Sequence, residues 1–206
     1  MTLLDALDVA GVVAFAVSGC AVALRRRMDL VGVVVLGIVT GLAGGVTRDV
    51  LLGDVPPLAL QQGRYLLAAV MTGAVVIVAG LPLVERIRQP VEVFDAVGLG
   101  LFAAVGAQRA TAAGVGLGGA VALGVISAIG GGLLRDILSN EVPQIFGAGS
   151  RLYAIPAALG AGVAALAERS GWAEEPSLIA AVLVTTLLRL GALRFGWHAP
   201  EPRRGR

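Results

Sequence analysis

The sequence has no lysine, and its 206 residues include a single cysteine and a single histidine. Cys20 alone cannot form a disulfide within the chain. His198 stands after the last apolar stretch, and the chain contains no HExxH motif, no Gly-x-Ser-x-Gly motif, no cysteine pair and no phosphate-binding glycine loop that ends in lysine. We therefore expect no enzymatic activity, no cofactor, no resident metal ion and no nucleic-acid partner.

Charged residues are also scarce, at 15% of the chain, whereas 57% of the residues are hydrophobic. A soluble domain of ordinary composition has about 25% charged residues, and a helix that crosses a bilayer needs about 20 apolar residues. Seven such stretches follow one another along the chain, at residues 3–24, 30–52, 64–84, 92–112, 116–138, 151–168 and 176–196. They show none of the alternation typical of membrane barrels. The sequence thus predicts an all-α integral membrane protein with seven transmembrane helices.

The arginines indicate how these helices are oriented. Arginines gather after the first, third and seventh stretches. They are residues 25–27, then Arg86 and Arg88, and finally Arg194, Arg203, Arg204 and Arg206. With seven spans these three places share one side, which the positive-inside rule makes cytoplasmic. We expect a multi-pass protein of the inner (plasma) membrane with its N-terminus outside, a cytoplasmic C-terminus, and a basic tail at 199–206 close to membrane lipids.

An internal repeat relates the two halves of the chain. An offset of 87 aligns residues 8–64 with residues 95–151 without a gap, and it places Arg48-Asp49 on Arg135-Asp136 and Val55-Pro56 on Val142-Pro143. Because each copy contains three spans, the second copy enters the membrane from the opposite side, as in the inverted repeats of secondary transporters. The sequence predicts a first repeat at 1–89, a second, inverted repeat at 90–172, and a seventh transmembrane helix at 173–198.

Glycines cluster in the second and fifth stretches, at Gly44-Gly45 and at Gly130-Gly131-Gly132. A glycine within a helix costs about 1 kcal/mol relative to alanine, so the clusters predict a helix break in each stretch. An unwound turn frees carbonyl groups, which in a membrane can face a cavity and bind cations. The alternative is close helix packing, because small residues at GxxxG spacing let membrane helices approach each other.

The ionisable pairs Arg48-Asp49 and Arg135-Asp136 follow these glycines. Ionisable groups within a span are costly and indicate function, so these four residues are predicted either to line a pore or to form ion pairs that hold the helices. Neighbouring residues point about 100° apart on a helix. We therefore expect the arginine and the aspartate of each pair to have different partners.

Other residues are candidates for a pathway through the membrane. An aspartate opens the first span and another opens the fourth, and the inversion would place these two acids at opposite pore mouths, although an acid is also favoured there by the helix dipole. Two phenylalanines could form a hydrophobic constriction or simply pack, and three hydroxyl side chains could line the path. These candidates are Asp8 and Asp95, Phe15 and Phe102, and Ser18, Thr40 and Ser127.

In combination these features resemble the prokaryotic branch of the trimeric intracellular cation (TRIC) channel family, whose bacterial members are also called glycine transporters. The resemblance covers nearly the whole chain and includes DVAGVVAFAVSGCAVA at residues 8–23, both glycine-Arg-Asp segments and both Val-Pro pairs. It implies a homotrimer with one pore in each protomer, crossed by K⁺ or another monovalent cation such as Na⁺, with the second and fifth helices kinked at the glycines. The chain departs from the family pattern at Ala43, where a third glycine could stand, and has no Lys-Glu-Val element.

Two other functions remain open from the residues alone. A secondary transporter of glycine or another small amino acid would use arginine for the carboxylate and aspartate for the amine, and both are present in each repeat. A structural membrane protein without flux would use the glycines for packing and the Arg-Asp pairs as ion pairs. The resemblance favours the cation channel.

Overall fold

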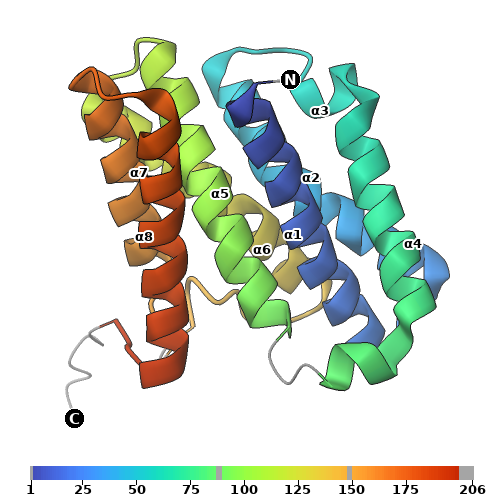
Figure 1. The fold of residues 1–206 in the computed structure, drawn as a ribbon. Coiled ribbons are helices and arrows are strands. Elements are labelled where there is room, and N and C mark those ends of the chain that lie inside the picture. The colour runs from blue at the N-terminus through green and yellow to red at the C-terminus, as the bar shows by residue number, and fades with distance from the viewer. Residues whose placement is uncertain (1, 87–89, 148–149, 200–206) are drawn as a thin grey trace.

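The computed structural model describes residues 2–86, 90–147 and 150–199, and within them the chain folds into helices with no β-strand (Figure 1). An isolated bridge between Arg151 and His198 is the one extended pairing in these ranges. The helices are α1 (Leu3–Arg25), α2 (Leu30–Leu52), α3 (Leu58–Gln61), α4 (Gly63–Arg86), α5 (Pro90–Ala112), α6 (Leu117–Leu138), α7 (Ala154–Arg169) and α8 (Glu174–Phe195).

Six of the described helices are long and apolar enough to cross a membrane: α1, α2, α4, α5, α6 and α8. The predicted all-α membrane protein is confirmed at this level. The predicted span 151–168 corresponds to α7, which has 16 residues and at 1.5 Å per residue covers about 24 Å. The predicted span 64–84 is interrupted at Gly80, where φ is 69° and ψ is 172°, and the helix that is long and apolar enough to cross the membrane is Gly63–Gly80. The short helix α3 was not predicted from the sequence.

The two halves of the chain run in opposite directions (Figure 1). In that view α1 and α4 descend and α2 ascends, whereas α5 and α7 ascend and α6 descends; α8 then descends beside α7. The start of α1 and the end of α8 consequently lie at opposite ends of the bundle (Figure 1). The centre of the bundle is formed by α1, α2, α5 and α6, which contact one another across the two halves.

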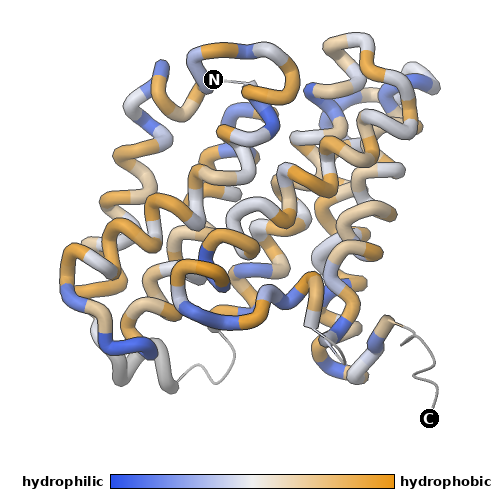
Figure 2. The backbone as a smooth tube through the Cα atoms, turned by 180° about the vertical axis from the view of Figure 1, so that it is seen from behind, coloured by the Kyte–Doolittle hydropathy of each residue, from blue (hydrophilic) through white to orange (hydrophobic). Residues whose placement is uncertain are grey.

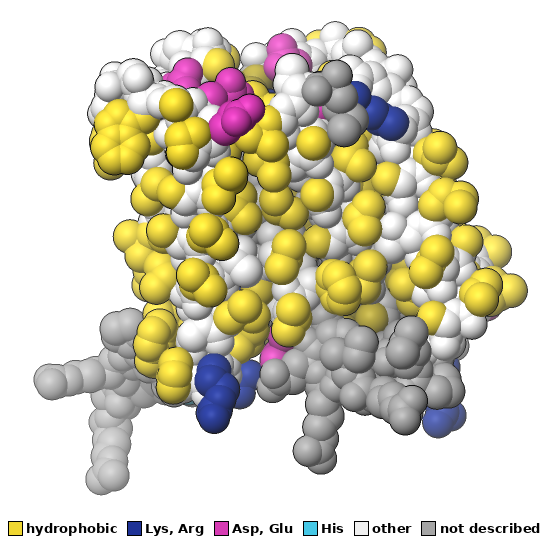
Figure 3. Space-filling model, in the orientation of Figure 1, with side chains coloured by type: hydrophobic (Ala, Val, Ile, Leu, Met, Phe, Trp, Pro, Cys, Tyr) yellow, Lys and Arg dark blue, Asp and Glu magenta, His cyan; other side chains and the backbone are white. Residues whose placement is uncertain are grey.

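Hydrophobic residues dominate the helices along their length, and hydrophilic ones gather mainly near the helix ends (Figure 2). On the surface, hydrophobic side chains cover the middle of the bundle (Figure 3). Acidic side chains stand out at the upper end of that view, and basic ones at the lower end and at one upper corner. This arrangement suits a helix bundle embedded in a bilayer with its two ends in water.

The glycine clusters allow close packing between α2 and α6 rather than breaking these helices. Both helices keep helical backbone through the glycines, so the predicted unwound turn is absent. A methyl group on Gly44 would overlap the carbonyl oxygen of Ser127, and a methyl group on Gly131 would overlap that of Thr40. Thr40 and Ser127 are themselves related by the offset of 87. Glycine lowers the stability of each helix, but it allows a close contact between the backbones of α2 and α6 that no larger residue permits.

This crossing generates a test of the role of glycine. Gly131→Ala places a methyl group against the Thr40 carbonyl, and overpacking of this kind lowers the free energy of unfolding by about 1–3 kcal/mol. Gly118→Ala is a matched control on the same helix, since nothing lies within 4 Å of its added Cβ. We expect a lower apparent unfolding temperature in detergent for Gly131→Ala and an unchanged or higher one for Gly118→Ala. Equal stability of the two variants would contradict the tight crossing.

Candidate functional site

A buried ion cluster joins α1 and α2 in the first half of the chain. Arg48 donates from Nη1 to Asp8 Oδ1 at 2.9 Å, from Nη2 to Asp8 Oδ2 at 3.0 Å, and from Nε to Asp49 Oδ1 at 2.9 Å. The arginine is only 1% exposed. A bidentate guanidinium–carboxylate pair is the strongest form of such an interaction, and here it fastens the start of α1 to the end of α2.

The second half contains the corresponding cluster. Arg135 donates from Nη1 to Asp95 Oδ1 at 2.6 Å and from Nε to Asp136 Oδ1 at 2.8 Å. Its Nη1 also donates to the Ser18 hydroxyl of α1 at 2.5 Å, and the Tyr153 hydroxyl donates to Asp95 Oδ1 at 3.2 Å. This second cluster is therefore bonded to the other half of the chain, through Ser18.

The neighbouring aspartates hold the chain where it leaves α2 and α6. Asp49 Oδ2 accepts from the backbone N–H of Leu58 at 2.9 Å, and Asp136 Oδ2 accepts from that of Gln144 at 3.0 Å. The prediction that the arginine and the aspartate of one pair have different partners is correct for the bonds to other segments of the chain. It is wrong in part, because each arginine also binds the aspartate that follows it in the sequence. The guanidinium has five donors on a long stem, so its Nε can face the adjacent carboxylate while its end reaches another helix.

Asp8 and Asp95 do not act as open pore mouths in this structure. They are 2% and 0% exposed, and both are ion-paired with the buried arginines. A carboxylate that neutralises a buried guanidinium is not free to concentrate cations from solution. The sequence signal for these two acids, their position at the start of a helix, does not distinguish an exposed mouth from a buried pair.

The remaining predicted residues lie at the centre of the bundle. The rings of Phe15 and Phe102 stack with centroids 5.4 Å apart and an interplanar angle of 13°. An added Cβ at Gly98 would lie 2.7 Å from the Phe15 ring, and one at Gly11 would lie 2.9 Å from the Phe102 ring. The two rings thus occupy space that glycines of the opposite helices leave open.

Thr40, Ser127 and Ser18 are completely buried. Thr40 donates to the Leu36 carbonyl within α2 at 2.6 Å, while the Ser127 hydroxyl has no partner among the described residues. Together with the phenylalanine pair, Thr40 and Ser127 surround the crossing of α2 and α6, whereas Ser18 accepts a hydrogen bond from Arg135.

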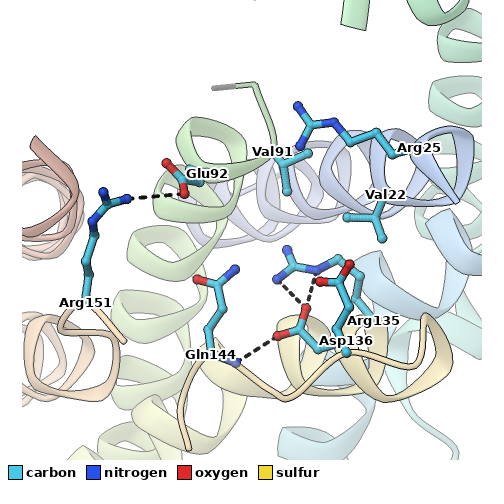
Figure 4. A pocket seen from close by; sticks show the side chains of 9 residues that line it. Val22, Arg25, Val91, Glu92, Arg135, Asp136, Gln144 and Arg151 are labelled. Atoms are coloured by element: carbon cyan, nitrogen blue, oxygen red, sulfur yellow. Dashed lines mark hydrogen bonds and ion pairs between the residues drawn. The ribbon is translucent and has the colours of Figure 1, made fainter. Parts of the chain in front are cut away.

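A polar cavity opens at one end of the bundle and reaches Arg135 and Asp136 (Figure 4). Its volume is about 360 Å³. The other lining residues are Val22, Arg25, Val91, Glu92, Glu141, Gln144 and Arg151. A second space, which borders Asp8, Arg48 and Asp49 and reaches Phe102 in the interior, is only about 10 Å³. Of these two spaces beside a buried cluster, the one at Arg135 and Asp136 is much the larger.

Sequence reasoning missed Glu92, Gln144 and Arg189 at this site. The offset of 87 pairs Glu92 with Asp5 and Arg151 with Arg64. In the structure Arg64 pairs with Asp5 and Arg151 pairs with Glu92, so the repeat contained a signal for Glu92. Arg189 of α8 is 1% exposed. It donates to Gln144 Oε1 at 2.5 Å and to two backbone carbonyls of the segment that follows α6, so α8 holds the wall of the cavity.

The described residues offer no metal centre, because nowhere among them do three or more His, Cys, Asp or Glu side chains gather in a way that could hold an ion. The buried carboxylates are occupied by guanidinium groups instead. The fold and the site define a multi-pass helical membrane protein with a buried Arg–carboxylate cluster in each half and a water-accessible cavity that leads to one of them.

Comparisons with known proteins specify the family. A family model described as "Glycine transporter" matches residues 5–80 and 92–169. A UPF0126 membrane protein of Deinococcus radiodurans is 44% identical over 156 residues, covering 76% of this chain and 72% of that protein. The UPF0126 inner membrane protein YadS of Escherichia coli K12 is 36% identical over 204 residues, covering 95% of this chain and 93% of that protein.

Solved structures agree. A structure from work on conductance through TRIC cation channels superposes with a TM-score of 0.88 at 36% identity and covers 100% of both chains. The TRIC orthologue from Rhodobacter sphaeroides has a TM-score of 0.87 at 36% identity, covering 95% of this chain and 100% of that chain. The chain belongs to the TRIC channel family, whose family model has the description of a glycine transporter, and the resemblance inferred from the sequence is confirmed.

The buried clusters generate a stability prediction. Arg48→Met leaves Asp49 buried without a counter-charge and leaves Asp8 with only the longer contact to Arg109, and breaking a buried pair in this way costs about 3–5 kcal/mol. The double variant Asp8→Asn/Arg48→Met removes two of the three charges, so we expect it to be less destabilised than the sum of the single variants. A double-mutant cycle of unfolding free energies in detergent measures the coupling. Additive effects would contradict the ion pair.

Proposed function

We propose that the protein is a channel for monovalent cations, permeable to K⁺, with one pathway in each protomer of a homotrimer in the inner membrane. The similar solved structures are cation channels, and the orthologue from Rhodobacter sphaeroides is a trimeric channel. The observation that carries the proposal for this chain is the polar cavity that reaches the buried Arg135–Asp136 pair. In a membrane protein, buried ionisable groups beside a cavity mark an ion or substrate path.

The pathway we propose lies between residues 1–89 and residues 90–172. It starts in the cavity, passes the stacked rings of Phe15 and Phe102 at the crossing of α2 and α6, and ends at the cluster around Asp8 and Arg48. The rings and the glycine contact close its middle in the present structure, which makes the phenylalanine pair a hydrophobic constriction that gates by excluding water. Ser18, Thr40 and Ser127 would supply the hydroxyl groups along it.

The two halves are proposed to be inverted repeats across the bilayer. The opposite directions of α1, α2 and α4 relative to α5, α6 and α7 support this (Figure 1). So do the matched contacts Arg48–Asp8 with Arg135–Asp95, and those of Gly44 and Gly131 with the carbonyls of the opposite helix. By the positive-inside rule, the arginines at the ends of α1 and α8 support our proposal that the open cavity faces the cytoplasm and that the N-terminus lies outside.

A transporter of glycine is the second candidate, because the cavity presents both guanidinium and carboxylate groups. However, Arg135 and Asp136 bind each other, so a zwitterion would have to separate a buried pair before it could bind them. A cation requires no such separation. The geometry therefore favours the channel.

Reconstitution into liposomes tests the function. We expect purified protein to dissipate a K⁺ gradient, read with a voltage-sensitive dye, and to accumulate no labelled glycine beyond protein-free liposomes. Phe15→Ala removes one ring of the constriction and should raise K⁺ flux, whereas Phe146→Ala, which removes an exposed ring outside the pathway, should leave flux unchanged. Saturable glycine uptake without cation flux would replace the channel by the transporter.

The inverted arrangement predicts opposite exposure of two turns. Asp54→Cys follows α2 and Glu141→Cys follows α6, and the native Cys20 is buried. In cells, a membrane-impermeant maleimide added outside should label Asp54→Cys but reach Glu141→Cys only after the membrane is permeabilised. Labelling of both cysteines from the same side would refute the inversion.

A further inference from the structure

The two ends of the protomer differ in openness although the repeat gives them the same charged groups. Arg64 Nη2 lies 3.3 Å from Asp5 Oδ2 at the closed end, and the corresponding Arg151 Nη1 lies 3.5 Å from Glu92 Oε1 at the open end. The buried arginine clusters correspond as well. Yet the space beside the first cluster is about 10 Å³ and that beside the second about 360 Å³. The shared charges cannot explain this difference.

Position 109 is one place at which the two ends differ in charge. Arg109 of α5 extends toward α1 in the other half, where its Nη2 lies 3.3 Å from Asp8 Oδ2 and 3.6 Å from Asp5 Oδ1. It thereby links the outer ion pair and the buried cluster into one continuous network. The offset of 87 pairs position 109 with Val22, which carries no charge and lines the large cavity.

At the open end, the position equivalent to Arg109 is Val22, and the side chain of Gln144 points into the space between the outer pair and the buried cluster (Figure 4). Arg151 and Glu92 line one part of the cavity and Arg135 and Asp136 another, so the cavity extends between the two pairs. A guanidinium in that space would fill it and repel cations. The valine therefore leaves room for water at the place where its counterpart fills the opposite end.

We propose that Arg109 is the gate residue that closes the Asp8 end of the pathway, and that Val22 leaves the other end open. This inference rests on the proposed channel function. Opening the closed end would require Arg109 to leave Asp8 and Asp5 while Arg48 stays in place. Arg109 would therefore act as the gate, and Arg48 would keep the structural ion pair with Asp8.

The contacts of Arg109 suit a group that moves. Its side chain is 19% exposed and its ion-pair distances are 3.3 and 3.6 Å, whereas Arg48 is 1% exposed and contacts Asp8 at 2.9 Å. The buried Nε of Arg109 has no partner among the described residues. Because Arg48 still binds both oxygens of Asp8, departure of Arg109 leaves no buried carboxylate unpaired, which avoids the main cost of breaking an internal pair.

The first test measures K⁺ flux in liposomes. Arg109→Val installs the residue found at the equivalent position, and we expect its flux to exceed that of the wild type by about fivefold, the shift produced when one weak ion pair no longer holds a closed form. Arg109→Lys keeps the charge and should remain near the wild type. Val22→Arg should lower the flux by filling the open end. Flux is compared per correctly sized oligomer, because a merely structural Arg109 would lower the folded fraction without raising flux.

The second test does not depend on conduction. Val12 is 2% exposed and borders the small space beside Asp8, so Val12→Cys in a Cys20→Ala background should react slowly with a positively charged methanethiosulfonate in detergent. Adding Arg109→Val should accelerate this reaction. Val22→Cys, in the open cavity, is the control and should react rapidly with or without Arg109→Val.

The outcomes separate the two proposals. A wild type without K⁺ flux would overturn the channel, and Val12→Cys labelling would then still decide whether Arg109 closes its end. A conducting wild type whose flux does not rise on Arg109→Val, or an unchanged labelling rate at Val12→Cys, would overturn the gate and leave the channel standing.

Discussion

Burial of arginine in an apolar bundle is the constraint on which the rest of this structure depends. A guanidinium cannot lose its charge within the protein and is costly to bury unless carboxylates and further acceptors satisfy it. Arg48 and Arg135 each receive two carboxylates, one from the neighbouring residue and one from the start of another helix. These pairs set how α1 lies against α2 and how α5 lies against α6, and the neighbouring aspartates also fasten the segments that follow α2 and α6.

The same constraint shapes the packing between the halves. Helices that must bring buried charges into register need to approach closely, and within lipid no hydrophobic driving force holds them together. Glycines at Gly44 and Gly131 let the backbones of α2 and α6 touch, and glycines at Gly11 and Gly98 accommodate the rings of Phe102 and Phe15. The centre of the bundle is consequently tight, whereas the cavity lies at one end, where the charges are solvated.

The construction keeps fully buried ionic groups apart from partly exposed ones. The buried arginines hold the scaffold through short bonds, while partly exposed groups such as Arg109 make longer ones at the ends. Arg189 adds a contact without a counterpart in the first half, since α8 lies outside the repeat and holds the cavity wall through Gln144. Departures from exact repetition, at positions 22 and 109 and in α8, are therefore the places where the two ends acquire different properties.

The sequence by itself determined the membrane class, the approximate positions of the long helices, the internal repeat and the family, because apolar length, charge scarcity and a fixed offset are properties of the linear chain. It also identified the residues at the centre, since glycine, arginine and aspartate are costly in a membrane helix wherever they stand. Only the tertiary structure decided what these residues contact. Glycine within a helix can signal a break or a close neighbour, and an acid at a helix start can face water or an arginine 40 positions away, as Asp8 does. These alternatives differ in the partner across the bundle, and no local pattern contains that information.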